Sequence, residues 1–270
     1  MIGVVVPAHN EERYIAACLA SLLAAARSPR LSEDVQIVVV LDACTDRTGA
    51  IAESFGIHTL RTESRNVGMA RAAGARHCLA AGARWLAFTD ADTLVDADWL
   101  AEQLRHDSDA VCGTVAVDNW SGYESAMQQH FEATYTDADG HRHIHGANLG
   151  VSAEAYRLAG GFQPLASSED VALVAALLAG GWSIAWTASP RVVTSARKDF
   201  RAPGGFGATL VRVDAAAIQL QAEPGDAPPR ALQLSHLPQV AQAPHVSHVQ
   251  RVPENVLLPA AERLAGSLPC

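Results

Sequence analysis

One stretch of the sequence reads Trp-Leu-Ala-Phe-Thr-Asp-Ala-Asp, residues 85–92. Its first five residues are a short, mostly apolar run, which is typical of a strand that is buried on both faces. Two aspartates, Asp90 and Asp92, belong to the segment that follows this run. Because they lie two residues apart on an extended segment, their side chains can point the same way. The stretch therefore predicts a buried strand that presents two carboxylates at one edge of a sheet.

Two earlier runs have the same form. Residues 2–6 are apolar and largely β-branched and stop at Pro7, and residues 35–41 are followed by Asp42. Segments with apolar residues at helical spacing separate the three runs. Strands that alternate with helices in this way predict a parallel sheet with helices on both faces.

Three helices are expected between these strands. The first should begin at Asn10, whose side chain can cap a helix, with Glu11 and Glu12 placed favourably in its first turn. The second should run from residue 45 or 46 to about residue 55, and the third over residues 66–81.

The second half of the chain has a mixed pattern. The elements expected there are a helix to about residue 105, a strand at 110–117, a helix at 123–135, a strand segment within 141–151, a helix at 171–179, and strands at 183–187 and 191–194. From about residue 222 the chain is rich in Pro and Gln and has little periodicity. We expect an extended or partly disordered tail there, with a short helix near residues 259–264.

The composition excludes several classes of function. A net charge of −9 argues against a nucleic-acid groove and against electrostatic binding to anionic lipid. The five cysteines are scattered without a CxxC pair, so no disulfide framework or zinc site is expected, and the cytoplasm is the expected location. No signal peptide is expected at residues 1–7, whose apolar run is short and lacks a basic leader. The apolar stretch 171–186 is interrupted by two glycines and is too short to span a bilayer.

The ends of the three predicted strands are where chemistry is expected, because ligands bind beyond the carboxyl ends of strands in an open parallel sheet. Carboxylates that converge there repel one another unless a cation or sugar hydroxyls lie between them. Asp90 and Asp92 offer hard oxygen ligands that suit Mg²⁺ or Mn²⁺. Such an ion would also reduce the repulsion between an acidic chain and a phosphorylated substrate. Three further Asp-x-Asp triplets, at 96/98, 107/109 and 137/139, are assigned to helix caps and turns.

Four ordered motifs give the chain a specific resemblance. They are Val-Val-Val-Pro-Ala-His-Asn-Glu-Glu (4–12), Val-Val-Leu-Asp-Ala-Cys-Thr-Asp-Arg-Thr (39–48), Arg-Asn-Val-Gly-Met-Ala-Arg (65–71) and Phe-Thr-Asp-Ala-Asp (88–92). Their order resembles that of family 2 glycosyltransferases, over roughly residues 1–200. The resemblance implies a GT-A fold: an α/β protein with a Rossmann-like, mostly parallel sheet flanked by helices, a smaller mixed acceptor-side subregion and an extended C-terminal tail.

The resemblance also implies a domain plan. Residues 1–220 would form one GT-A catalytic domain, and residues 221–270 would be the Pro/Gln-rich tail. Within the domain, residues 1–95 would be the nucleotide-binding half and residues 96–220 the acceptor-binding half.

Site residues follow from the same resemblance. The nucleobase and ribose would be held by Pro7, His9, Glu11 and Asp42, and the nucleotide would also be contacted by Arg65 and Gly68. Asp90 would contact the ribose or sugar, and Asp92 would ligate the metal. Asn148, within Gly146–Gly150, would line the sugar and acceptor pocket. The chain departs from the family at the end of its second strand, where the family often has two aspartates and this chain has Leu41 before a single Asp42.

Glu169 and Asp170 stand at the start of an apolar helix. Such a pair can simply cap a helix, and Glu33-Asp34 shows that it also arises without chemistry. By the resemblance, Asp170 would be the catalytic base, with Glu169 as its neighbour or as an acceptor contact. An inverting transfer needs a carboxylate of this kind to accept the proton of the acceptor hydroxyl.

The alternation of His141, His143 and His145 leaves two interpretations open. The three imidazoles on one face of a strand could hold a metal ion. The interpretation we favour is that they are solvent-facing strand residues near the pocket.

A basic cluster near the end of the predicted domain is also open to two interpretations. It comprises Arg191, Arg197, Lys198 and Arg201 and is followed by a glycine-rich loop at residues 203–207. The cluster either closes on the diphosphate and neutralises the leaving group, or is a solvated loop.

The expected function is the transfer of a hexosyl or N-acetylhexosaminyl group from a nucleoside-diphosphate sugar to an unknown acceptor hydroxyl. Inversion, a Mn²⁺ or Mg²⁺ cofactor and a UDP-sugar donor are expected by family habit. Alternatives are a retaining transferase on the same fold and a non-catalytic nucleotide-binding homologue. A nucleotidyltransferase would usually carry a Gly-rich loop after the first strand, and residues 7–13 contain no glycine. No nucleic-acid partner is expected, and an oligomer is compatible with the sequence.

Overall fold

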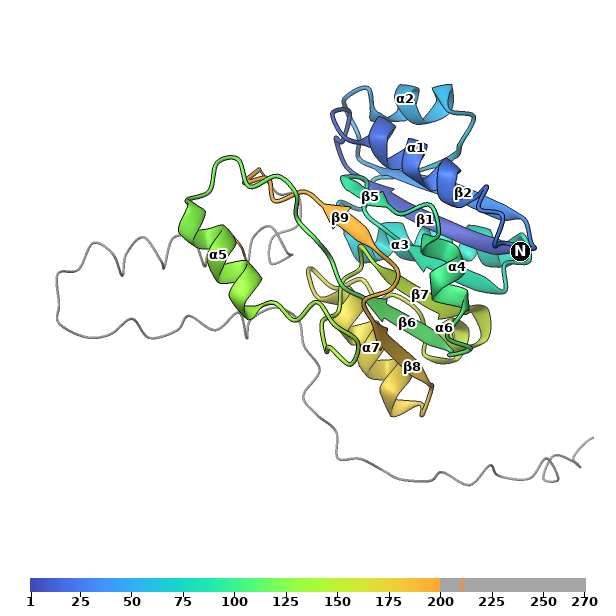
Figure 1. Cartoon of the computed structure of the whole chain (residues 1–270). Coiled ribbons are helices and arrows are strands. Elements are labelled where there is room, and N and C mark those ends of the chain that lie inside the picture. Colours follow the sequence, from blue (N-terminus) through green and yellow to red (C-terminus); the bar gives the residue numbers. More distant parts are fainter. Residues whose placement is uncertain (200–209, 211–270) are drawn as a thin grey trace, which may run out of the picture. The chain divides into compact units, whose positions relative to one another are not determined.

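A seven-stranded sheet forms the centre of the protein in the computed structural model, which describes residues 1–199 and 210 (Figure 1). The strand order is β3-β2-β1-β4-β7-β6-β8. The strands are β1 (Ile2–Ala8), β2 (Val35–Asp42), β3 (His58–Thr62), β4 (Trp85–Phe88), β6 (Ala110–Gly113), β7 (Leu149–Ser152) and β8 (Ile184–Thr187). Only β7 runs antiparallel to its neighbours, β4 and β6; every other pairing in this sheet is parallel. The expected α/β class with a mostly parallel sheet is confirmed.

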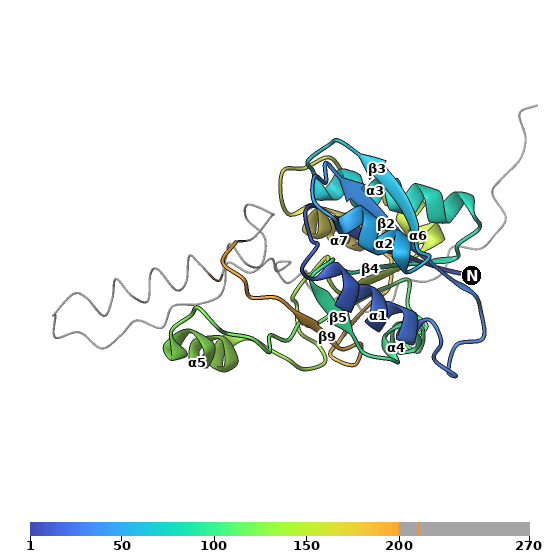
Figure 2. The ribbon, with the colours of Figure 1, turned by 90° about the horizontal axis from the view of Figure 1, so that it is seen from above.

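Helices cover both faces of the sheet (Figure 2). One face packs against α1 (Ile15–Ala25), α2 (Thr48–Ser54) and α4 (Trp99–Leu104), and the other against α3 (Val67–Ala80), α6 (Ala153–Leu158) and α7 (Glu169–Ala179). The alternation of side chains along β1 explains the two cores: Val4 and Val6 enter one, and Val5 enters the other. The remaining helix, α5, spans Ser125–Thr134.

A second, two-stranded sheet lies beside the end of β4. It pairs β5 (Thr93–Val95) antiparallel with β9 (Val192–Thr194), and Thr93 stands opposite Thr194. Their hydroxyl oxygens lie 2.9 Å apart and are buried. This small sheet brings the chain that leaves β9 next to the residues that follow β4.

The prediction that Asn10 caps the first helix is wrong. Helix α1 begins only at Ile15, so Glu11 and Glu12 precede it. Asn10 adopts a left-handed conformation with φ 56°, and its side-chain oxygen accepts from the backbone N–H of Thr45 at 2.8 Å. A contact with the loop after β2 therefore replaces the local cap.

Some other boundaries also differ from the prediction. The edge strand β3, strand β5 and helix α6 were not predicted, because each is short or lacks an apolar run. The strand expected at 110–117 ends at Gly113, and within 141–151 the strand begins only at Leu149. The third predicted helix is confirmed, with Asn66 as its N-cap accepting from Met69 N at 2.9 Å.

Several predictions fall on residues that the structure does not describe. They concern Arg201, the glycine-rich loop at 203–207, the tail at 221–270 and the short helix near 259–264. The domain boundary at residue 220 also remains a prediction. Among the described residues, no helix has the length and apolar character needed to cross a membrane.

Helix α3 lies unusually close to the sheet at Gly74. A Cβ atom there would collide with Val5 Cγ1 and would lie 3.1 Å from Val40 Cγ2. We expect Gly74→Val to lower the free energy of unfolding by about 2–3 kcal/mol, because the core cannot admit the extra methyl groups without shifting. Urea denaturation measures this difference.

The matched control is Arg76→Ala, which changes an exposed residue of the same helix and should stay within about 0.5 kcal/mol of the parent. Equal stability of the Gly74→Val protein and the parent would show that α3 does not pack tightly on β1 and β2.

Candidate active site

Acidic side chains gather at the carboxyl ends of β1, β2 and β4, as the sequence predicts. Strand β1 lies between β2 and β4 in the sheet. Glu11 follows β1, Asp42 ends β2, and Asp90 and Asp92 follow β4. Arg197 pairs with both Glu11 and Asp92, and the charges of Asp90 and Glu11 act on Asp92, so the structure brings these three carboxylates together at one edge.

Asp42 organises the segment between β3 and α3. Its carboxylate accepts from the side chain of Thr62 at 3.0 Å and from the backbone N–H groups of Ser64 at 2.7 Å, Arg65 at 3.0 Å and Asn66 at 2.8 Å. Burial opposes its ionisation, but these hydrogen bonds outweigh that effect and lower the pKa of Asp42 below its usual value. Asp42 is therefore an ionised residue that fixes the shape of this segment.

Three further residues proposed for the nucleotide on this side differ in exposure. The Arg65 side chain is exposed and forms no ion pair with another described residue. His9 is half-buried, and its Nδ1 donates to the backbone carbonyl of Asp42 at 2.6 Å, since a carbonyl can only accept. Pro7 is buried within β1 opposite Val40. These placements leave Arg65 as the side chain able to reach outward.

Asp92 and Glu11 share one cation, the guanidinium of Arg197. Arg197 donates to Glu11 at 2.5 Å and lies 3.2 Å from Asp92. Burial raises the pKa of Asp92 to about 7; Arg197 opposes this rise, and the nearby Asp90 and Glu11 add to it. Because burial destabilises the ionised form of Asp92, a neighbouring cation is needed to keep this carboxylate ionised.

Arg71 is the functional residue that the sequence analysis did not single out. This α3 side chain is almost fully buried, and it donates to Asp90 at 2.5 Å and to Glu169 at the start of α7. Gly146 makes room for it, because a Cβ atom at that position would collide with the guanidinium. A signal was present in the sequence: Arg71 lies on the apolar face of α3 with Cys78, and a buried arginine requires acidic partners.

The Glu169–Asp170 pair lies in the first turn of α7. Asp170 accepts from the backbone N–H of Gly146 at 2.8 Å. Burial and the neighbouring Glu169 raise the pKa of Asp170 to about 6, while Arg71 opposes this rise. A carboxylate of this pKa is ionised at neutral pH and is basic enough to accept a proton.

Gly68 lets α3 approach the start of α7. A Cβ atom at Gly68 would lie 2.6 Å from the carbonyl oxygen of Gln163 and 3.1 Å from the Glu169 side chain. The neighbours of Gly68 in the structure are thus protein atoms near the start of α7. A contact between Gly68 and the nucleotide stays a prediction.

Asn148 lies in the interior rather than at an open surface. It is 1% exposed, its amide NH₂ donates to the carbonyls of Thr114 and Pro190, and its oxygen accepts from Trp99 Nε1 at 2.9 Å. These bonds occupy the NH₂ group and the oxygen of the amide, and a contact of Asn148 with the sugar or acceptor stays a prediction.

The three histidines are buried, so the prediction of solvent-facing strand residues is wrong. His141, His143 and His145 are 3%, 3% and 6% exposed, and all precede β7. His143 stacks on Tyr135 with ring centroids 4.2 Å apart, and the Tyr135 hydroxyl hydrogen-bonds His145 Nε2 at 2.9 Å. Aromatic packing, rather than strand alternation, fixes these side chains.

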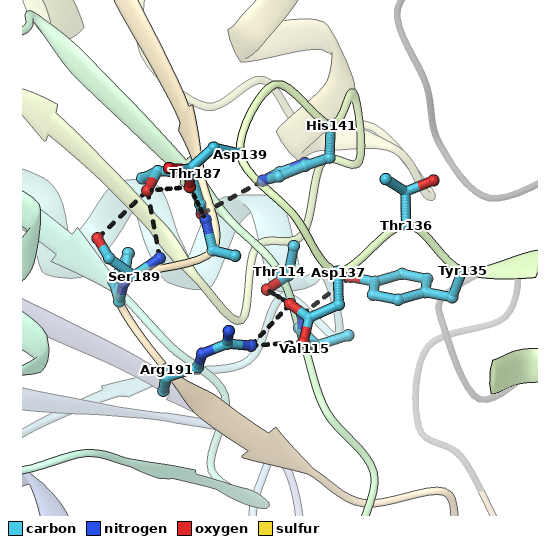
Figure 3. Close-up of polar contacts among 12 residues, drawn as sticks. Thr114, Val115, Tyr135, Thr136, Asp137, Asp139, His141, Thr187, Ser189 and Arg191 are labelled. Atoms are coloured by element: carbon cyan, nitrogen blue, oxygen red, sulfur yellow. Dashed lines mark hydrogen bonds and ion pairs between the residues drawn. The ribbon is translucent and has the colours of Figure 1, made fainter.

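Two aspartates hold the preceding turn in place (Figure 3). Asp137 accepts from Thr114 at 2.6 Å and pairs with Arg191, and Asp139 accepts from Thr187 at 2.9 Å. Their assignment to a turn fits these contacts. Arg191, one member of the basic cluster, is thereby occupied away from Asp92.

The donor set fits a cation that is shared with a diphosphate. Among the described residues, no group of three or more His, Cys, Asp or Glu side chains is arranged to hold a metal ion by itself. Mg²⁺ and similar ions are commonly held by one or two carboxylates together with substrate phosphates. Asp92, with Asp90 two residues away, can supply that part of such a site.

Comparison with known proteins agrees with this architecture. The sequence profile described as "Glycosyl transferase family 2" matches residues 3–159. No curated protein gives a significant match. Among solved structures, residues 1–349 of S. aureus TarS in complex with UDP-GlcNAc are similar with a TM-score of 0.58 and 18% identity, covering 84% of this chain and 68% of that chain. The mannosyltransferase PcManGT from Pyrobaculum calidifontis, in complex with GDP-Man and Mn²⁺, gives 0.57 and 20%, covering 84% and 65%. The chain thus spans about two thirds of the length of these two proteins, and at these identities they show a shared fold.

The buried histidines make stability sensitive to acid. Burial lowers the pKa of His143 to about 4, below its value in an unfolded chain. Between these two values the unfolded chain binds more protons, so stability present at neutral pH is lost as the pH falls. We expect His143→Phe, which can keep the stack on Tyr135, to reduce the fall in Tm between about pH 7.5 and about pH 5 by roughly 3 °C.

Comparing the two proteins at both pH values removes the contribution of Asp92 and Asp170, whose raised pKa values act in the opposite direction. An identical fall in Tm in parent and variant would contradict a neutral, buried His143.

Proposed function

The chain belongs to glycosyl transferase family 2, and we propose that it transfers a sugar from a nucleoside-diphosphate sugar to an acceptor hydroxyl with inversion at the anomeric carbon. The observation that carries the proposal is one connected cluster. Asp90 on the donor side is joined through Arg71 to Glu169, and Asp170 adjoins Glu169 on α7. The cluster connects the proposed general base, Asp170, with Asp90, which lies two residues before the proposed metal ligand Asp92.

The donor would lie over the carboxyl ends of β1, β2 and β4. His9, Glu11 and the segment shaped by Asp42 would form the nucleotide side, with Arg65 reaching outward. Asp92 would hold a Mn²⁺ or Mg²⁺ ion, whose chemistry when bound is to neutralise the leaving diphosphate. The Mn²⁺ in the PcManGT complex supports this choice of cofactor.

Asp170 would act as the general base. It would accept the acceptor hydroxyl's proton as the hydroxyl oxygen bonds to the anomeric carbon, and the bond from that carbon to the diphosphate would break on the opposite face. Its bonds to Gly146 N–H and to Val171 N–H fix its orientation. Arg71 would position Asp90 and Glu169 and would limit how far the pKa of Asp170 rises.

The proposed donor is a UDP-sugar, and the sugar a hexose or an N-acetylhexosamine. The TarS complex holds UDP-GlcNAc and the PcManGT complex holds GDP-Man, so both nucleotides belong in the first test. Thermal shift with UDP and GDP, each with and without Mn²⁺, ranks them, because a ligand of the folded state raises Tm by mass action.

Donor hydrolysis tests the two carboxylates without knowledge of the acceptor, because water then takes the acceptor's place. With Mn²⁺ and UDP-GlcNAc or GDP-Man, we expect Asp170→Asn to lower kcat by about 10²- to 10⁴-fold while nucleotide binding persists. Asp92→Ala should weaken the Mn²⁺-dependent part of nucleotide binding as well as the rate.

Glu53→Gln is the control, since among the described residues Glu53 forms its ion pair with exposed Arg61 of the edge strand β3. A fully active Asp170→Asn protein would exclude Asp170 as the base, and NMR of the product anomer would decide between inversion and retention.

The rate should fall in acid with one proton. Because the base must be ionised and the pKa of Asp170 is about 6, kcat at saturating donor and Mn²⁺ should drop about tenfold per pH unit below that value. Glu169→Gln removes the negative neighbour that raises this pKa, so the midpoint should move to lower pH. A shift to higher pH in this variant, or a flat profile in the parent, would contradict the assignment.

A further inference from the structure

Arg197 places a positive charge between two of the carboxylates on the donor side, Glu11 and Asp92. Its Nη1 donates to Glu11 Oε2 at 2.5 Å, and its Nη2 pairs with the other Glu11 oxygen and lies 3.2 Å from Asp92 Oδ2. The side chain is only 10% exposed, and its guanidinium lies over the ring of Tyr14 at 4.9 Å. Arg197 therefore occupies the surroundings of Asp92 that a metal ion would need.

The small sheet of β5 and β9 explains this position. Thr93 pairs with Thr194 in antiparallel register, so the chain that leaves β9 passes the residue that enters β5. Asp92 directly precedes Thr93, and Arg197 follows Thr194 by three residues. The backbone N–H of Arg197 also donates to Ser195 Oγ at 3.3 Å, a local bond within the segment that follows β9.

A divalent ion and this guanidinium cannot share Asp92 without strong repulsion, because both are cations in a site with little water. Removing the guanidinium without a replacement is also unfavourable, because Glu11 and Asp92 would remain as buried negative charges. A change of partner for Arg197 therefore requires a new anion for the guanidinium and a new cation for the carboxylates.

A metal-bound nucleoside diphosphate supplies both at once. Its phosphate oxygens match the planar fork of a guanidinium, which binds phosphate in a bidentate manner as readily as it binds carboxylate. Its metal ion can take the place that Arg197 leaves beside Asp92. The total charge of the site then stays close to balance throughout the exchange.

We infer that Arg197 determines when the site accepts a divalent ion: it holds Glu11 and Asp92 in the free protein and moves to the diphosphate when the metal-bound donor enters. The inference rests on the proposed function. Its consequence is that the free protein binds Mn²⁺ weakly, and that Mn²⁺ and nucleoside diphosphate each increase the affinity for the other.

Mn²⁺ binding to the nucleotide-free protein tests this inference without any turnover. The EPR signal of free Mn²⁺ would be measured during titration of the full chain and of Arg197→Gln. We expect the variant to bind Mn²⁺ at least about tenfold more tightly, because its carboxylates have lost their internal cation. With UDP or GDP present, the gain in Mn²⁺ affinity caused by the nucleotide should be smaller in the variant than in the parent.

Two further variants serve as controls. Arg191→Gln removes an arginine that pairs with Asp137 instead of Asp92, and it should bind Mn²⁺ as the parent does. Arg197→Lys keeps the charge, so Mn²⁺ binding should stay weak, while the loss of the bidentate fork should weaken UDP binding in the presence of Mn²⁺. The Lys variant keeps the test decisive if the Gln variant fails to fold, since tight Mn²⁺ binding by it would overturn the inference.

The outcomes separate this inference from the proposed function. Suppose that the parent protein binds UDP or GDP in the presence of Mn²⁺. If Arg197→Gln then binds Mn²⁺ no more tightly than the parent does, the role of Arg197 is overturned and the transferase proposal stays intact. A parent that binds neither nucleotide with Mn²⁺ would overturn both.

Discussion

Negative charge held away from water is the constraint on which the described structure depends. Two guanidinium groups compensate this negative charge: Arg71 pairs with Asp90 and Glu169, and Arg197 pairs with Glu11 and Asp92. Buried carboxylates without such partners would be protonated or would destabilise the fold. Helices α3 and α7 and the β5–β9 sheet bring these groups together. The contacts that hold the proposed active site together are therefore also contacts that stabilise the fold.

The sheet topology divides the work between two sides. Parallel strands β1, β2 and β4 bring their carboxyl ends to the donor side, where ligands bind in open α/β sheets. The antiparallel strand β7 is different: the chain that enters it passes the start of α7, where Gly146 bonds Asp170. One reversed strand therefore places Gly146 and Asp170 on the proposed acceptor side, beside the proposed nucleotide site at the ends of the parallel strands.

Local pattern sufficed for the buried strands, for the Asn66 cap of α3 and for the acidic residues at the strand ends. It did not suffice for the residues that connect them. Arg71 and Glu169 are 98 residues apart, and Arg197 and Glu11 are 186 apart, so no periodicity or spacing links them. The prediction that the three histidines face solvent was wrong for a similar reason, because their burial depends on packing against Tyr135, which no local pattern indicates. The edge strand β3 was not predicted because all its residues are partly or fully exposed and it carries no apolar run.

Gly146 has a consequence for how this sequence can change. The space that its missing side chain leaves is filled by the guanidinium of Arg71, so the two positions are constrained jointly. A larger residue at 146 is incompatible with arginine at 71. A smaller residue at 71 removes the need for glycine at 146, but it leaves Glu169 without this ion pair. Substitutions at these two sites should therefore be strongly epistatic. Combinatorial libraries aimed at altered acceptor preference should hold this pair constant and diversify residues outside it.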